Sequence, residues 1–217
     1  VDLERFTPGA KDPTLVDSLG LAGATVIGCI GTMSNWYLRN EMLRYLARLG
    51  ETLDRSRILI VTREDHEELR QDAEMAGVPH DRLVITRADF ADMPRFIRLF
   101  DAGLFFIKPA LSKRGSAATK LAEFLACGVP VIINAGVGDS GTIVREGRVG
   151  VVLPTVDEDA LKQSLPAVQA LLADRAIGDR CRQVARERFD VEQGVRQYRC
   201  LYERLRQQPR PKEANRC

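Results

Sequence analysis

Short apolar segments alternate with helical ones along most of the chain, and this alternation constrains the fold more than any other feature. The strand-like segments are apolar throughout and span residues 24–31, 57–62, 82–86, 102–107, 130–134 and 149–154. Strands that are apolar on both faces need helices on both sides, as in a parallel sheet. The sequence therefore predicts an α/β fold with a doubly wound, Rossmann-like parallel sheet.

The intervening segments are predicted to be helices, and they divide the chain. Helices are expected near 36–49, 65–77, 93–100, 117–127 and 142–147, and three more, near 157–172, 175–188 and 191–206, should pack outside the sheet. We predict an interdomain linker at 1–24, one Rossmann-like domain at 25–190, a C-terminal helix at 191–208 and a flexible tail at 209–217. Ligands of such sheets bind at the carboxyl ends of the strands, so the loops near 31–36, 86–93, 108–119 and 135–142 are the candidate site.

The stretch GSAATKLAEFLACG places a lysine in the first turn of a predicted helix. Lys120 is unfavourable there, because a helix N-terminus carries partial positive charge, unless an anion docks on the exposed N–H groups. Ser116 is the expected N-cap of a helix beginning at Ala117, and Thr119 adds a hydroxyl donor. Glu123 lies on the same face as Lys120 and could accept hydrogen bonds from a ribose. The pattern predicts a phosphate site, with a simple Lys120–Glu123 salt bridge as the alternative.

The block around Lys120 resembles a known family. TKLAEFLACGVPVI, preceded by KPALSKRGSA, is similar to the C-terminal nucleotide-sugar-binding domain of group 1 (family 4) glycosyltransferases. The opening VDLERF resembles the junction between the two domains of those enzymes. The family signature E-A-x-A-x-G-x-P-V-I aligns with Glu123, Phe124, Ala126, Gly128, Pro130, Val131 and Ile132.

The resemblance implies one half of a two-domain GT-B transferase, with a nucleoside diphosphate sugar as donor and a glycan or lipid-linked acceptor. It places Glu123 on the ribose and Lys120 with Thr119 on the diphosphate. The turn at Gly31 and Thr32 would approach the phosphates. The nucleotide-sugar-binding residues it implies, together with those read from the motif, are Gly31, Thr32, Thr86, Arg87, Lys113, Ser116, Thr119, Lys120 and Glu123, with the backbone near Thr86 and Arg87 on the base.

The sequence departs from the family in the loops on either side of the phosphate site. The first glutamate of the usual E-x7-E pair is replaced by Gly115, and the arginine and lysine expected in the first loop are not evident in GTMSNWYLRN, although Arg39 is near. Lys113 and Arg114 could supply the missing positive charge. The resemblance therefore implies nucleotide binding more firmly than a particular sugar contact, and the catalytic residues stay unknown.

Two other motifs suggest rival functions. GVGDSG at 136–141 fits the G-x-G-x-x-G fingerprint, so an NAD(P)-type dinucleotide-binding domain is the alternative, although a lone fingerprint is weak. A nucleotide-binding module without catalysis is a third reading. The run of Asp157, Glu158 and Asp159 fits the D-x-D of metal-dependent transferases, but it opens a helix, where acidic residues act as caps.

Composition indicates an intracellular protein without a metal or cofactor. The formal net charge is +2, which requires no nucleic acid, and no apolar run is long enough for a transmembrane helix. Cys29, Cys127, Cys181, Cys200 and Cys217 show no zinc or disulfide spacing, and the histidines are two. We expect reduced thiols, no metal site and a cytoplasmic location.

The C-terminal segment VEQGVRQYRCLYERLRQ is amphipathic and rich in arginine. An apolar stripe at 3–4 residue spacing comprises Val191, Val195, Tyr198, Tyr202 and Leu205. This helix is predicted to brace an N-terminal domain of the same enzyme. An ordinary packed helix, or weak contact with the anionic inner face of a membrane, are the alternatives.

Overall fold

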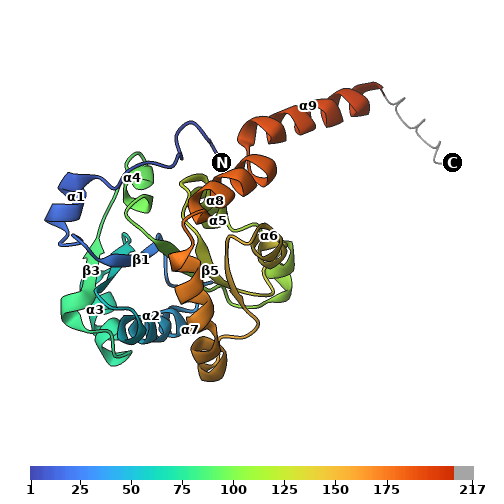
Figure 1. Ribbon diagram of the computed structural model, residues 1–217. Coiled ribbons are helices and arrows are strands. Elements are labelled where there is room, and N and C mark those ends of the chain that lie inside the picture. Colours follow the sequence, from blue (N-terminus) through green and yellow to red (C-terminus); the bar gives the residue numbers. More distant parts are fainter. Residues whose placement is uncertain (208–217) are drawn as a thin grey trace.

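The computed structural model describes residues 1–207 and contains a six-stranded parallel sheet in the order β3-β2-β1-β4-β5-β6 (Figure 1). The strands are β1 (Thr25–Ile30), β2 (Ser56–Val61), β3 (Leu83–Thr86), β4 (Ala102–Phe105), β5 (Val131–Asn134) and β6 (Gly150–Leu153). This is the order of a doubly wound Rossmann sheet, so the predicted fold class is confirmed.

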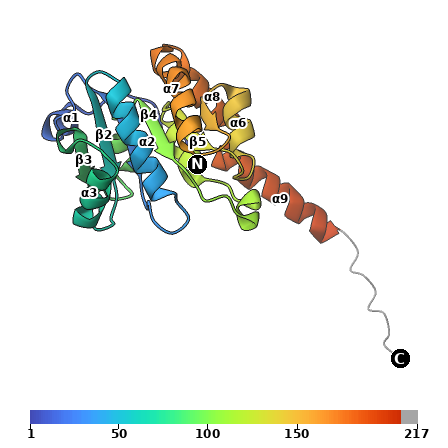
Figure 2. The same ribbon diagram turned by 90° about the horizontal axis from the view of Figure 1, so that it is seen from below.

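Helices cover both faces of the sheet. They are α1 (Pro13–Ser18), α2 (Arg39–Thr52), α3 (His66–Met75), α4 (Met93–Ile97), α5 (Thr119–Ala126), α6 (Ser140–Gly147), α7 (Glu158–Ala173), α8 (Ile177–Arg188) and α9 (Val191–Gln207), with 3-10 turns at His80–Arg82 and Leu111–Gly115. Helix α2 packs against α3 and α7, and α5 packs against α4 and α8 (Figures 1 and 2).

Two glycines at the centre of the sheet bring the α5 side close to it. Gly28 of β1 and Gly103 of β4 are paired neighbours in the parallel register. A Cβ at Gly28 would lie 2.3 Å from the ring of Phe100, and one at Gly103 would lie 2.6 Å from the ring of Phe124. The two rings, 5.8 Å apart, therefore fill the space that side chains on the strands would occupy. Phe124 belongs to α5, so this packing fixes the helix that carries Lys120.

Helix α5 begins later than the sequence suggested. Its N-cap is Ala118, which makes no side-chain capping bond, so the assignment of Ser116 as N-cap of a helix from Ala117 is wrong. The backbone of Ser116 is held elsewhere, because its N–H donates to the carbonyl of Lys113 at 3.2 Å. Ser116 is left extended, and the helix starts at Thr119.

The first 24 residues are ordered against the domain. Phe6 and Leu21 are buried in the core. Arg182 of α8 donates to the carbonyls of Leu3 at 2.7 Å, Phe6 at 2.6 Å and Ala126 at 2.8 Å, and so ties this segment to the body of the protein.

Helix α9 projects from the rest of the molecule (Figures 1 and 2). None of its described residues is buried, so the expectation of packing outside the sheet holds for α7 and α8 but is wrong for α9. Among residues 1–207, no core surface lies beneath the apolar stripe. The predicted tail at 209–217 lies outside the described residues. Within 1–207, no helix has both the length and the apolar character needed to cross a membrane.

Candidate functional site

The carboxyl ends of β1 and β4 form the switch point of the sheet, because the chain order reverses between them. The loop after β1 is joined there to the segment after β4. Leu38 donates its N–H to the carbonyl of Phe106 at 3.0 Å, and Lys108 donates to the carbonyl of Trp36 at 2.8 Å. These bonds hold the first loop and the lead-in to α5 side by side.

A buried asparagine ties the next strand to the same segment. The amide of Asn134, at the end of β5, donates to the carbonyl of Ile107 and accepts from its N–H, both at 2.8 Å. The loop after β5 also closes on this region. Gly138 has a φ of +48° and donates to the carbonyl of Lys113 at 2.9 Å. A Cβ at Gly138 would stand 2.1 Å from the carbonyl oxygen of Ser116.

Lys120 reaches across the switch point. Its Nζ donates to the carbonyl of Thr32 at 3.0 Å and lies 3.7 Å from the centre of the Tyr37 ring. The side chain passes beside Gly31, where an added Cβ would be 3.5 Å from Cε of Lys120. No ion pair between described residues joins Lys120 to Glu123. The simple salt bridge is therefore not the arrangement that the chain adopts.

Burial sets the electrostatics of this pair. Desolvation lowers the pKa of Lys120 to about 8, although Cys29, Glu64 and Glu123 act in the opposite direction. Desolvation also raises the pKa of Glu123, against the opposing effect of Lys120. Within residues 1–207, no residue donates a hydrogen bond to the Glu123 carboxylate. An ammonium with a carbonyl partner and a carboxylate with open acceptor sites can both receive a polar ligand.

Lys113 and Trp36 form the outer rim of the site. The Nζ of Lys113 lies 4.2 Å from the centre of the Trp36 ring, which is 52% exposed. With this exposure, Trp36 lies at the rim of the site and is not packed in the core. Lys113 lies over the Trp36 ring at this rim, whereas Lys120 lies over the ring of Tyr37, the next residue of the same loop.

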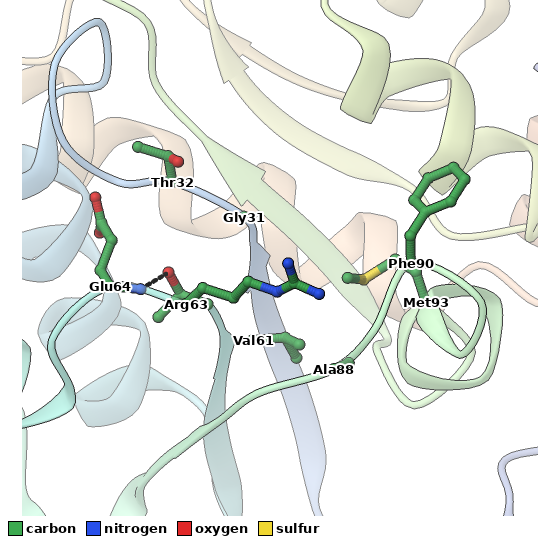
Figure 3. A pocket seen from close by; sticks show the side chains of 9 residues that line it. Gly31, Thr32, Val61, Arg63, Glu64, Ala88, Phe90 and Met93 are labelled. Atoms are coloured by element: carbon green, nitrogen blue, oxygen red, sulfur yellow. Dashed lines mark hydrogen bonds between the residues drawn. The ribbon is translucent and has the colours of Figure 1, made fainter.

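A cavity of about 450 Å³ opens beside the Gly31 turn (Figure 3). Figure 3 shows Thr32 and Glu64 on one side and Phe90 with Met93 on the other, with Arg63 extending between them. The complete lining is Gly31, Thr32, Val61, Thr62, Arg63, Glu64, Ala88, Phe90 and Met93. The mixture of apolar walls and a few polar groups is typical of a small-molecule pocket.

The predicted base contact lies at the border of this cavity. The carbonyl of Thr86 accepts a hydrogen bond from the N–H of Thr62 at 2.9 Å, so it extends the sheet. Arg87 is exposed. Neither residue lines the cavity, which is bounded from the same loop by Ala88 and Phe90.

Glu64 holds the first loop in shape. Its carboxylate accepts from the N–H groups of Met33 and Ser34, both at 3.1 Å, and from the Ser34 hydroxyl. Arg39 is not free to replace the missing first-loop arginine of the family pattern. Its guanidinium forms ion pairs with three carboxylates: Asp72 at 2.7 Å, Glu68 at 2.8 Å and Glu64 at 3.4 Å.

The rival motifs have structural explanations. The second glycine of GVGDSG is Gly138, which follows β5 and packs against the backbone of Ser116, so its close approach is to the protein itself. Asp157 is the N-cap of α7 and accepts from the N–H of Ala160 at 2.9 Å, as its place at a helix start predicts. The thiols of Cys29, Cys127 and Cys181 are buried and unpaired, and burial raises the pKa of each to about 12.

Several residues of this region were not found from the sequence. Glu64, Phe90 and Asn134 reach it from three different loops or strand ends. Only their positions just after predicted strands gave a signal, and polar or aromatic residues are common there.

Comparison with known proteins identifies the family. The sequence profile described as "Glycosyl transferases group 1" matches residues 24–174. None of the curated proteins compared with the chain gave a significant match.

Solved structures share the fold at low sequence identity. A glycosyltransferase from Rickettsia africae has a TM-score of 0.76 at 15% identity, over 96% of this chain and 56% of that one. HepE from Anabaena, solved with UDP-glucose, has a TM-score of 0.72 at 19% identity, over 94% of this chain and 55% of that one.

A third structure corresponds to a single domain. The C-terminal domain of the group 1 glycosyl transferase LpcC from Francisella tularensis has a TM-score of 0.65 at 16% identity, over 88% of this chain and 99% of that one. The chain thus spans about half the length of the larger relatives and nearly all of a C-terminal domain. From its sequence match, which extends over most of the Rossmann-like domain, the chain belongs to the group 1 glycosyltransferases.

Proposed function

We propose that this chain is the donor-binding half of an enzyme that transfers a sugar from a nucleoside diphosphate sugar to a glycan or lipid-linked acceptor. Family membership supports the reaction class. The observation that carries the proposal is the position of Lys120, whose ammonium bonds to Thr32 across the switch point instead of pairing with Glu123. A lysine in that position can close over a diphosphate docked at the α5 N-terminus.

The remaining groups fit successive parts of such a donor. Thr119, exposed in the first turn of α5, offers a hydroxyl to the diphosphate. The open acceptor sites of Glu123 suit the two hydroxyls of a ribose. The cavity beside Gly31 would take the base, with Phe90 as an apolar wall. Lys113, whose carbonyl accepts a hydrogen bond from the N–H of Ser116, would face the outer phosphate or the sugar.

The base is proposed from the relatives. HepE was solved with UDP and with UDP-glucose. Because HepE shares this fold at 19% identity, a uridine diphosphate sugar is the first donor to test here. The donor is proposed to bind without a metal.

Transfer needs a second domain, because a sugar donor must be shielded from water and aligned with its acceptor. We propose that an N-terminal domain of the same enzyme supplies the other wall, and that residues 1–24 form the junction. The exposed apolar stripe of α9 would brace that domain. The proposed location is the cytoplasm, with any membrane contact peripheral.

Calorimetric titration with uridine, guanosine, thymidine and adenosine diphosphates tests the proposal directly. At least one of them should bind, and Lys120→Met should weaken binding by about 1.5–3 kcal/mol, the range for hydrogen bonds to charged groups. Lys162→Met is the matched control, since Lys162 lies on α7 and, within residues 1–207, pairs only with Glu158, at 3.7 Å.

Equal affinity of Lys120→Met and the wild type would contradict the assigned role of Lys120. Binding of NAD in preference to all four diphosphates would favour the dinucleotide-binding alternative. If the longer enzyme binds a donor but transfers no sugar to any acceptor, the chain is a nucleotide-binding module without catalysis.

A further inference from the structure

The ammonium of Lys120 is held by groups that carry no net negative charge. Among the described residues, the ammonium contacts the Thr32 carbonyl at 3.0 Å and the face of the Tyr37 ring at 3.7 Å. Burying an ammonium is costly unless polar groups replace water, and an aromatic face replaces part of it through its quadrupole. A carboxylate in the same place would pair with the lysine and repel an arriving phosphate. A neutral ring attracts the cation without repelling the anion.

The Tyr37 ring is placed by the backbone on either side of it. Tyr37 forms an antiparallel bridge with Ile107 and donates its N–H to the carbonyl of Ser34 at 3.2 Å. The next residue, Leu38, donates to the carbonyl of Phe106 at 3.0 Å. The ring is thus anchored to the segment that leads from β4 towards α5, whether or not Lys120 touches it. This anchoring gives the lysine a defined resting place beside the Gly31 turn.

We propose that Tyr37 is a positioning residue, which holds the charged amine of Lys120 over the Gly31–Thr32 turn, ready for a ligand diphosphate. The inference rests on the proposed function in taking a nucleoside diphosphate as that ligand. Tyr37 touches the lysine, and acts on the phosphate through it. The two consecutive aromatic residues of the loop differ in their partners. The Tyr37 ring contacts Lys120, whereas the Trp36 ring contacts Lys113 at the rim.

The charge of Lys120 is sensitive to this contact. Burial lowers the pKa of Lys120 to about 8. The titratable groups that face it are Cys29 of β1, Glu64 after β2 and Glu123 of α5, and Tyr37 contacts it directly. Loss of the ring in favour of an aliphatic side chain would remove an interaction with the charged form only. The pKa of Lys120 should then fall further, and less of the lysine would be charged at neutral pH.

Two variants separate the ring from its hydroxyl. Tyr37→Leu keeps an apolar side chain and removes the aromatic face, whereas Tyr37→Phe keeps the face. Calorimetry with UDP across the pH range around the Lys120 pKa should show wild-type affinity that declines as pH rises through about 8. At neutral pH, Tyr37→Leu should bind UDP about tenfold more weakly than the wild type, which is the free-energy scale of one desolvated cation–π contact. Its affinity for UDP should also begin to decline at a lower pH than that of the wild type. Tyr37→Phe should match the wild type.

A second measurement needs no nucleotide. Competitive acylation of lysines followed by mass spectrometry reports the pKa of Lys120 from the rate at which its neutral amine reacts. Lys120 of Tyr37→Leu should react faster at neutral pH than in the wild type, and Tyr37→Phe should not differ. Lys162, remote on α7, is the internal reference in each sample.

The outcomes distinguish this inference from the proposed function. If the wild type binds no nucleoside diphosphate, the proposed function fails, while acylation still reports on Tyr37. If Tyr37→Leu leaves both the UDP pH profile and the acylation rate unchanged, the positioning role is overturned. Weaker binding by Tyr37→Leu with an unchanged pH profile and unchanged acylation would mean a structural role only, and would also overturn it.

Discussion

Lys120 and Glu123 show how the surroundings of one helix turn decide what two side chains do. On an exposed helix, a lysine and a glutamate three residues apart would commonly pair. Here the lysine bonds to Thr32 and the carboxylate stays open to a ligand. The two groups could therefore meet different parts of the proposed donor, with the diphosphate at Lys120 and the ribose hydroxyls at Glu123.

Glu123→Gln tests the ribose contact. A carboxylate accepts strongly from two hydroxyls, whereas an amide has one acceptor oxygen and presents donors beside it. The wild type should prefer UDP over its deoxyribose analogue, and the variant should lose about tenfold of that preference, as expected for one hydrogen bond to a charged group. Parallel calorimetric titrations with the two nucleotides measure the ratio. A wild type that binds both equally would remove the ribose role from Glu123.

The loops after β4 and β5 are assembled by packing of backbone against backbone. Gly138 packs against the Ser116 carbonyl with a left-handed φ of +48°. The side-chain amide of Asn134 donates to the backbone carbonyl of Ile107 and accepts from its N–H. The fingerprint GVGDSG is thus a loop-closing element in this chain, and its second glycine is required for a reason unrelated to a dinucleotide. The lead-in to α5 depends on it.

Gly138→Ala should therefore destabilise the fold. The new Cβ would be 2.1 Å from the Ser116 oxygen at a backbone conformation that alanine rarely adopts. We expect the free energy of unfolding in urea to fall by about 2–4 kcal/mol, the sum of a clash and left-handed strain. Gly115→Ala is the control, because no atom of the described residues, beyond Gly115 and its two chain neighbours, lies within 4 Å of a Cβ built there. Equal stability of the two variants would show that the loop moves aside freely.

The molecule as a whole has one compact body and one projecting helix. Within α9, Tyr198 and Tyr202 are 64% and 63% exposed, with nothing from residues 1–207 burying them. An apolar stripe of this kind generally meets a partner surface. The stripe could pack against a second domain or bind an anionic membrane. These two functions can be distinguished, because only membrane binding depends on lipid charge and salt concentration.

Liposome sedimentation separates these partners. With bracing, the chain should stay in the supernatant with neutral and anionic liposomes alike, even at low salt. Replacement of Tyr198 and Tyr202 by serine should then leave the unfolding free energy of the isolated chain within about 0.5 kcal/mol, because neither ring is buried in it. In a longer protein with the N-terminal domain, the same replacement should lower stability. Pelleting with anionic liposomes alone, reversed by high salt, would instead support membrane contact.

The sequence was sufficient for the sheet and its parallel character, and it predicts a site at the carboxyl ends of the strands. Continuous apolar strands separated by helices leave few other arrangements, and a lysine in the first turn of α5 signals an anion site by simple electrostatics. The helix start at Thr119 was missed, since it depends on how Ser116 is held by Lys113 and Gly138. Which carboxylate or ring meets Lys120, and whether α9 packs, depend on contacts between residues far apart in the chain. Local propensity and residue spacing do not encode such long-range contacts. These contacts form only when the folded sheet brings the loops that follow its strands to one edge.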